Sequence, residues 1–165
     1  MAEDPSYAVL DEALLSLRRL WAAPGQRVAA DVSEGQAVQF STVLVVDAVG
    51  RLSRRDPAAA PTVAAVADQL AVTESTASRI VDRAVRAGVV DRSPSPENRR
   101  RARLTLTDAG GRLDARARGI WLGYLRLLLE GWDEQDVTTF AGLLERFAAR
   151  VHRHPPPQDR EERTT

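Results

Sequence analysis

Two short helical patterns separated by a three-residue break constrain the fold of this chain more than any other feature of its sequence. The first pattern covers residues 62–70 and the second covers 74–87, with apolar residues at three- and four-residue spacing in each. Thr62 and Thr73 stand where N-cap residues are expected, and Gly88 stands where a helix would end. Two helices joined by so short a turn form a helix-turn-helix.

A β-hairpin is predicted directly after these helices. Residues 89–93 and 102–106 have the β-branched, alternating character of short strands. Pro94 and Pro96 fall in the loop between them, where no ladder hydrogen bond is needed. We call this hairpin the wing, and it turns the helix-turn-helix into a winged helix.

Further helices are predicted on both sides of this centre. An amphipathic stripe covers 6–22, and 36–52 has helical spacing in spite of its β-branched run. Thr107 can cap a long helix and Asp133 can cap the last one. The expected fold class is mainly α with a small β-hairpin wing, a winged helix-turn-helix with N- and C-terminal dimerisation helices.

The apolar stripes of the terminal helices exceed what one small winged-helix core can bury. A second copy of the chain is the simplest surface to cover them, so we predict a homodimer. We expect residues 1–165 to form a single chain with dimerisation helices at 6–23 and 108–151. The winged helix-turn-helix lobe would cover 36–107, and the polar segment 152–165 would be a disordered tail.

Charge is balanced over the whole chain but not along it. The sequence has 23 basic residues, all of them arginine, and 23 acidic residues. Residues 61–107 contain eight arginines and five acidic residues, a net charge of +3. A basic centre on a neutral protein indicates a polyanionic partner, although a solvated charged hairpin would have the same composition.

The outward face of the second helix carries the residues expected to meet that partner. Ser75, Thr76 and Ser78 are short hydroxyl side chains near the helix N-terminus, where they suit phosphate oxygens. Arg79 is long enough to reach a base edge and can pair with O6 and N7 of guanine. Arg83 lies one turn further along. A plain solvated helix face is the alternative for these residues alone, but the basic wing that follows favours duplex DNA.

Three arginines lie at or near the wing tip, namely Arg99, Arg100 and Arg101. Narrow, A·T-rich minor grooves attract arginine electrostatically. We predict that Arg99 enters a minor groove and that Arg100 and Arg101 bind flanking phosphates.

The segment 62–110 resembles the winged-helix domain of the MarR family (multiple antibiotic resistance regulators). Asn98 stands where the family usually has an Asp that helps to orient a wing arginine, so we expect Arg99 to be held less rigidly. The likeness is carried by the runs Ser75-Thr76-Ala77-Ser78-Arg79, Val81-Asp82-Arg83, Gly88-Val89-Val90-Asp91-Arg92, Asn98-Arg99-Arg100 and Leu106-Thr107-Asp108-Ala109-Gly110.

The resemblance implies an obligate homodimer on an inverted-repeat operator, with recognition helices in successive major grooves and wings in the outer minor grooves. Family members usually repress transcription, and many release DNA when a small anionic or phenolic ligand binds. We therefore expect a sequence-specific DNA-binding transcriptional regulator, a repressor. Its partners would be double-stranded DNA, a second copy of itself and a small anionic or aromatic effector, whose binding residues are unknown.

A winged-helix dimer that binds proteins rather than DNA is the alternative function. Such a module would be expected to lack arginine on the helix and the wing, and this chain has both. The sequence contains no Gly-rich phosphate loop, metal-ligand cluster or nucleophile with a suitable base, so we expect no enzyme activity, no catalytic residue and no cofactor.

The remaining sequence features limit the kind of signal that the protein could sense and its location in the cell. No cysteine is present, which excludes thiol-based redox sensing. The two histidines, His152 and His154, fall in the predicted tail and are assigned to no metal site. No apolar run is long enough to span a bilayer and the N-terminus lacks a signal sequence, so we expect a cytoplasmic protein without membrane contact.

Overall fold

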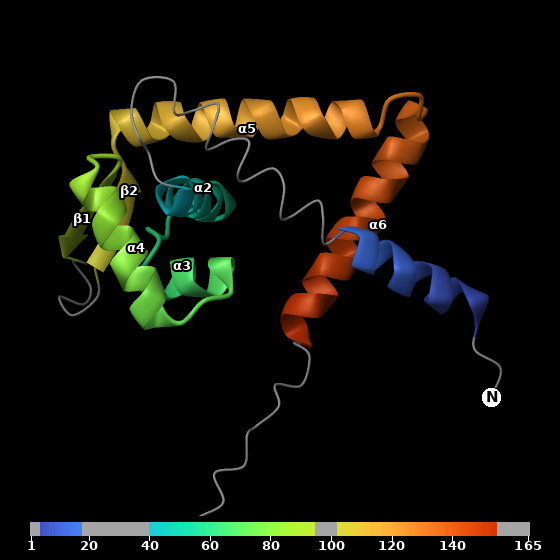
Figure 1. Cartoon of the computed structure of the whole chain (residues 1–165), viewed down its shortest axis with the longest axis horizontal. Coiled ribbons are helices and arrows are strands. Elements are labelled where there is room, and N and C mark those ends of the chain that lie inside the picture. The colour runs from blue at the N-terminus through green and yellow to red at the C-terminus, as the bar shows by residue number, and fades with distance from the viewer. Residues whose placement is uncertain (1–3, 18–39, 95–101, 155–165) are drawn as a thin grey trace, which may run out of the picture. The chain divides into compact units, whose positions relative to one another are not determined.

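The structure, a computed structural model, describes residues 4–17, 40–94 and 102–154 (Figure 1). Its contacts divide the chain into two compact units, Met1–Gly123 and Tyr124–Thr165. A helix covers 5–17. The other elements are α2 (Phe40–Arg55), α3 (Val63–Leu70), α4 (Glu74–Arg86), β1 (Val90–Pro94), β2 (Ala102–Leu106), α5 (Asp108–Leu128) and α6 (Glu134–Arg153).

Helix α2 forms the centre of the first unit's core. The predicted helix in this region is confirmed from Phe40 onward, in spite of the β-branched run. Val45, Val46 and Val49 are fully buried there and pack with buried side chains of α3 and α4. Burial on more than one side of α2 outweighs the small helix-propensity cost of valine, which arises from lost χ1 freedom.

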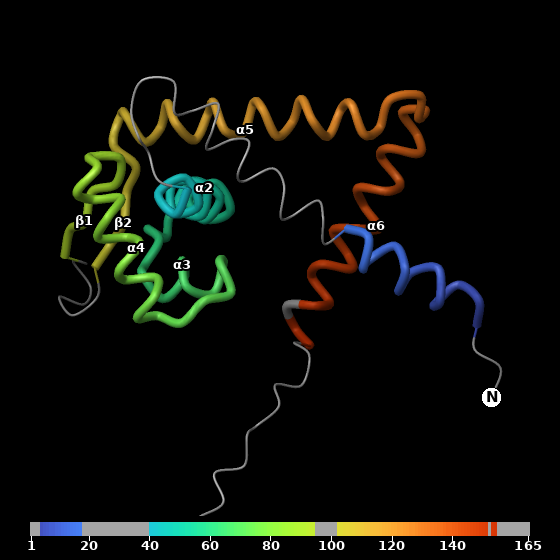
Figure 2. Tube along the Cα trace, viewed as in Figure 1, coloured from blue at the N-terminus to red at the C-terminus, as the bar shows by residue number. Residues whose placement is uncertain are grey.

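The helix-turn-helix forms as the sequence predicts, and local hydrogen bonds define its ends. Thr62 Oγ1 accepts from the Ala65 amide at 3.2 Å, and Thr73 Oγ1 accepts from the Thr76 amide at 3.3 Å. Ala71 ends α3 in the left-handed region with φ 52°. Gly88, with φ 70°, follows the last residues of α4. Figure 2 shows the tight path of the chain from α3 into α4.

The two wing strands are antiparallel, with Val90 opposite Leu106 and Arg92 opposite Leu104. Leu104 is fully buried and anchors the wing to the core. Its amide donates to the Pro61 carbonyl at 2.8 Å. This bond fixes the base of the wing to the chain segment that enters α3.

The start of α5 is joined to the wing by close backbone packing. Thr107 Oγ1 donates to the Gly88 carbonyl at 2.8 Å and accepts from the Gly110 amide at 3.1 Å, which confirms Thr107 as a cap. A Cβ on Gly110 would lie 1.9 Å from the carbonyl oxygen of Val89. The helix therefore begins against the backbone of the wing at a position that only glycine fits.

A nearly buried ion pair connects α5 to α2. The Asp114 carboxylate, whose side chain is 10% exposed, pairs with the Arg54 guanidinium. Both guanidinium NH2 groups reach the carboxylate, and Arg54 Nη2 lies 3.5 Å from Asp114 Oδ1. Gly50 leaves room for this pair, because a Cβ there would lie 2.6 Å from Asp114 Oδ1. The first half of α5 is thereby fixed on α2.

The second unit contains the end of α5 and the whole of α6. Asp133 caps α6 by accepting from the Asp136 amide at 2.7 Å, as the sequence predicts. The Trp132 and Phe140 rings meet edge to face, with centroids 5.6 Å apart. Helix α6 continues to Arg153, two residues into the segment predicted as a tail. Within the described ranges, no helix is long and apolar enough to cross a membrane.

Candidate nucleic-acid interface

Helix α4 turns one face to the core and the opposite face to solvent. Ala77, Val81 and Ala84 are fully buried at 0% exposure. With 3.6 residues per turn, the outermost line on the other side of α4 runs through Ser75, Arg79, Asp82 and Arg86. The face that the sequence predicts to meet DNA is therefore the solvent-exposed side of α4, and the opposite side of the helix is packed in the core.

Hydroxyl groups cluster at the N-terminus of α4. Thr73 Oγ1 donates to Thr76 Oγ1 at 3.0 Å and lies 3.1 Å from Ser75 Oγ. Because the Thr76 oxygen accepts from Thr73, the Thr76 hydroxyl can donate its own proton to an oxygen outside the helix. Ser75 is exposed, whereas Thr76 and Ser78 are half-buried on the flanks of the helix. The first turn of α4 thus presents the exposed Ser75 hydroxyl and a Thr76 hydroxyl whose proton is free to bind an acceptor.

Arg79 and Arg83 project from the exposed side of α4. The ion pairs within the described residues join Arg51 to Asp47, Arg54 to Asp114 and Arg92 to Asp82, and none of them involves Arg79 or Arg83. Both guanidinium groups therefore keep their full hydrogen-bonding capacity for an external anion.

Asp82, in the middle of this face, is neutralised by the wing. Arg92 on β1 donates to Asp82 Oδ1 at 2.9 Å, across ten residues of sequence. Both side chains are partly exposed, at 39% and 45%, so the pair contributes at most about 1 kcal/mol to stability. It shields an acidic charge that would otherwise repel phosphate. The role of neither residue was predicted from the sequence.

The predicted wing-tip residues Arg99, Arg100 and Arg101 lie outside the described residues, as does Asn98. The strands that carry the tip are described up to Pro94 and from Ala102 onward. Arg103 on β2 is half-buried and opposite Ser93.

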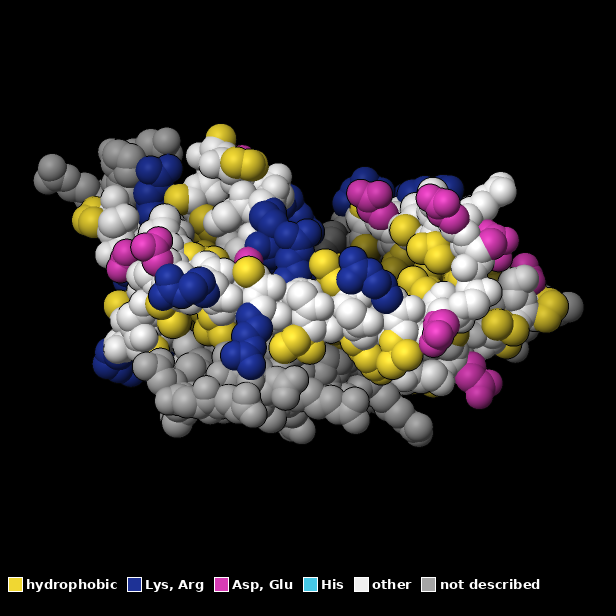
Figure 3. Space-filling model, turned by 90° about the horizontal axis from the view of Figure 1, so that it is seen from above, with side chains coloured by type: hydrophobic (Ala, Val, Ile, Leu, Met, Phe, Trp, Pro, Cys, Tyr) yellow, Lys and Arg dark blue, Asp and Glu magenta, His cyan; other side chains and the backbone are white. Residues whose placement is uncertain are grey.

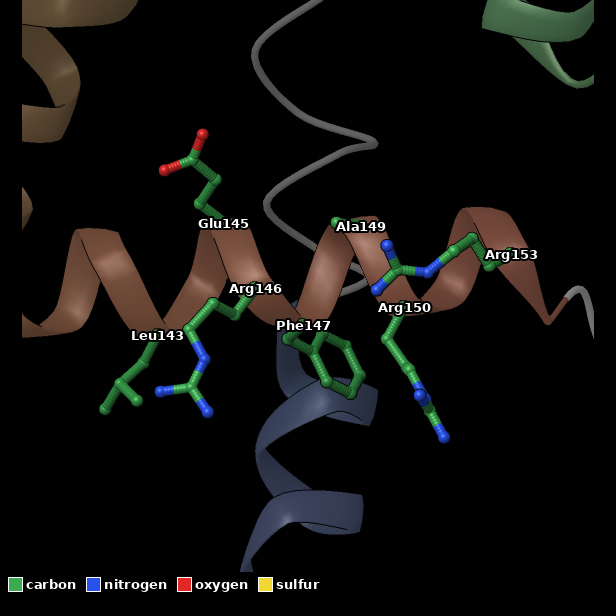
Figure 4. Close-up of a pocket in the computed structure, with 7 residues that line it drawn as sticks. All are labelled: Leu143, Glu145, Arg146, Phe147, Ala149, Arg150 and Arg153. Atoms are coloured by element: carbon green, nitrogen blue, oxygen red, sulfur yellow. The ribbon is translucent and has the colours of Figure 1, made fainter.

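A shallow hollow lies elsewhere, on α6. It is lined by Leu143, Glu145, Arg146, Phe147, Ala149, Arg150 and Arg153. Figure 4 shows Leu143, Arg146, Phe147 and Arg150 projecting from one side of the helix. Because one helix supplies all seven residues, the hollow is an open helix face. In the part of the chain that the structure describes, no group of His, Cys, Asp or Glu side chains could hold a metal ion.

Comparison with known proteins identifies the winged-helix centre. The model of the MarR family matches residues 42–101, from α2 into the wing. No curated protein matches the chain.

Solved structures share the fold over most of their length. A MarR family protein from Bacillus stearothermophilus is 19% identical, with a TM-score of 0.65 over 92% of this chain and 99% of that chain. FabT from Streptococcus pneumoniae, in complex with DNA, is 18% identical, with a TM-score of 0.64 over 88% and 97%. PcaV from Streptomyces coelicolor, in complex with its natural ligand, is 22% identical, with a TM-score of 0.53 over 80% and 88%.

The expected fold class, mainly α with a two-stranded wing, is confirmed by the elements and by these shared folds. The family match covers the helix-turn-helix whose caps and outward face are described above. The family match shows that residues 42–101 are similar to the MarR family of transcription regulators, and the solved structures show that the chain shares their fold.

Proposed function

We propose that the protein is a sequence-specific DNA-binding repressor that acts as a homodimer on an inverted-repeat operator. One observation carries this proposal: the solvent face of α4 combines hydroxyl groups in its first turn with Arg79 and Arg83, which take part in no ion pair among the described residues. Phosphate oxygens and base edges are the groups that such a face binds best. FabT, which has a similar fold, was solved in complex with DNA, and this supports DNA as the partner.

Each residue of the face has a distinct role in this proposal. Arg79 reads a base edge, where a bidentate contact to guanine contributes roughly 1–3 kcal/mol of discrimination. Ser75, Thr76, Ser78 and Arg83 bind backbone phosphates and fix the register. The wing arginines Arg99, Arg100 and Arg101 act in the minor groove and on its flanking phosphates. Since this duplex is chromosomal DNA, the protein would act in the cytoplasm.

A second copy of the chain is the proposed partner for the terminal helices. Five large apolar side chains of α6 are between 42% and 54% exposed in the single chain, namely Phe140, Leu143, Leu144, Phe147 and Val151. Apolar side chains also reach the surface between charged ones in Figure 3. Contiguous exposed apolar surface of this kind marks an interface, and a two-fold dimer buries it on both copies. We propose 6–23 and 108–151 as the dimerisation helices.

Selection of binding sites from a random duplex pool tests the proposed reading of DNA. The wild-type protein should enrich an inverted repeat with half-sites about one helical turn apart. Arg79→Gln should still bind duplex but with a relaxed preference at one base pair per half-site. If Arg79→Gln selects the same sequence as wild type, Arg79 does not determine the base preference.

The salt dependence of binding separates this function from a protein-interaction module. A protein that contacts phosphates loses affinity steeply as salt rises, because bound counterions are released from DNA. If the wild-type dimer ignores duplex DNA at 50 mM salt, the alternative of a winged-helix module for protein partners takes its place. Footprinting on DNA beside the protein's own gene, with a transcription reporter, tests repression against activation.

Release of DNA by a small anionic or aromatic effector is the last part of the proposal. The similar fold of PcaV, solved with its natural ligand, supports a ligand-responsive protein. Titration of the protein–DNA complex with benzoate and with phenol, followed by fluorescence anisotropy, measures release directly. Complexes that keep their affinity across a panel of such compounds would argue against an effector of this chemistry.

A further inference from the structure

Helix α4 carries a third exposed arginine, Arg86, on the same line as Arg79. Seven residues separate the two, so their directions around the helix axis differ by only about 20°. The same seven residues place Arg86 about 10.5 Å further along the helix. Arg86 thus points the same way as the proposed base-reading residue, but two turns away.

The Arg86 side chain has no charged partner among the described residues. None of the ion pairs or side-chain hydrogen bonds found among the described residues involves it. The nearest acid on the same line is Asp82, and Arg92 of the wing already holds that carboxylate at 2.9 Å. The charge of Arg86 is therefore unopposed along the outermost line of α4.

We propose that Arg86 is a further DNA-contact residue, which binds a backbone phosphate at the edge of the major groove while Arg79 reaches a base. The proposal rests on the proposed DNA-binding function. A B-DNA major groove is about 12 Å wide, so two side chains about 10.5 Å apart on one helix face can span from its floor to a bordering phosphate. The Asp82–Arg92 pair lies between them and keeps the intervening surface free of net negative charge.

A phosphate contact has a signature that distinguishes it from a base contact. It contributes to affinity for every sequence and releases counterions, so its loss lowers the salt dependence of binding without changing base preference. The alternative is that Arg86 only interacts favourably with the helix dipole at the C-terminal end of α4. In that case it would affect stability slightly and the salt slope not at all.

The test compares wild type, Arg86→Gln, Arg86→Lys and Arg112→Gln in binding to a fluorescent random-sequence duplex between 50 and 200 mM salt. Arg112 is an exposed arginine of α5, the helix that follows the wing, and serves as the matched control. For each copy of Arg86 that contacts DNA, Arg86→Gln should reduce the slope of log K against log salt by about 0.9. Arg86→Lys should restore the slope, and Arg112→Gln should leave it unchanged.

The other possible outcomes also test the proposed phosphate contact of Arg86. If wild type binds with a steep salt slope and Arg86→Gln has the same slope, the inference is wrong while the proposed function stands. If Arg86→Gln instead relaxes the sequence selected from a random pool, Arg86 reads a base and the phosphate assignment fails. If wild type itself does not bind duplex, the proposed function fails first. Circular dichroism and melting curves confirm that the Gln variant is folded, which its exposed position favours.

Discussion

Gly50 on α2 leaves room for the part-buried ion pair between Asp114 and Arg54. A methyl group there would lie 2.6 Å from Asp114 Oδ1, and Asp114 has little room to move because its side chain is only 10% exposed. We expect Gly50→Ala to lower the free energy of unfolding by about 1–3 kcal/mol, as the carboxylate leaves its guanidinium or α2 shifts. Chemical denaturation with urea measures the change.

A double-mutant cycle isolates the cause of this effect. In an Asp114→Ala chain the new methyl group no longer meets a carboxylate, so Gly50→Ala should cost much less. The expected coupling energy between the two substitutions is about 0.5–3 kcal/mol. Strictly additive effects would show that Gly50 does not act through Asp114.

Ala71 is held in a backbone conformation that L-residues avoid. Its φ of 52° ends α3 in the left-handed region, which costs a non-glycine residue about 1–2 kcal/mol. Ala71→Gly should raise the free energy of unfolding by roughly 0.5–1 kcal/mol, because glycine loses more chain entropy and so recovers only part of the strain. Ala64→Gly, exposed within α3, is the control and should lose about 1 kcal/mol in thermal unfolding. Destabilisation at both positions would contradict the assignment of strain to Ala71.

At the scale of elements, adjacent glycines at the start of α5 should respond in opposite ways. A Cβ on Gly110 would meet the Val89 carbonyl oxygen at 1.9 Å, whereas a Cβ on Gly111 would meet nothing within 4 Å. Gly110→Ala should therefore displace α5 from the wing and cost about 3 kcal/mol or more, since backbone cannot move aside. Gly111→Ala should gain roughly 0.5–1 kcal/mol from helix propensity. Equal melting temperatures for the two variants would exclude close packing as the reason for Gly110.

Sequence reasoning located these elements because their end signals are local. The structure confirms four predicted N-caps, in each of which a side chain accepts from an amide three residues ahead: Thr62, Thr73, Thr107 and Asp133. The wing strands are also local: the structure has the second strand at the predicted 102–106 and the first at 90–94, one residue beyond the predicted 89–93. Local signals of this kind can be read from sequence because the donor and acceptor are fixed by spacing alone.

Contacts between elements were not predicted, because they depend on how the helices pack. Arg54 and Asp114 are sixty residues apart, and Asp82 and Arg92 join a helix to a strand. Neither pair has a spacing that marks it in the sequence. The unopposed charge of Arg86 also depends on packing, because Asp82 is paired with Arg92 of the wing.

At the scale of the whole molecule, the exposed apolar face of α6 predicts which substitutions would break the proposed dimer. Leu143 and Phe147 project from the same side of α6 and are 54% and 47% exposed (Figure 4). Leu143→Glu combined with Phe147→Glu should convert a dimer at micromolar concentration into a monomer, because two charges cannot be buried in an apolar interface without partners. Sedimentation velocity measures the mass, and the monomer should also bind the selected operator at least about tenfold more weakly, since it engages only one half-site.

Ala149→Glu is the matched control, because Ala149 lies on the opposite side of the same helix (Figure 4). It adds a charge to α6 without touching the apolar face, so the dimer and its operator affinity should persist. A double variant that still sediments as a dimer would show that α6 is not part of the interface. A wild-type chain that sediments as a monomer would contradict the proposed dimer. The geometric reason for an inverted repeat would then be lost too, because a single recognition helix reads one half-site with no fixed spacing to a second.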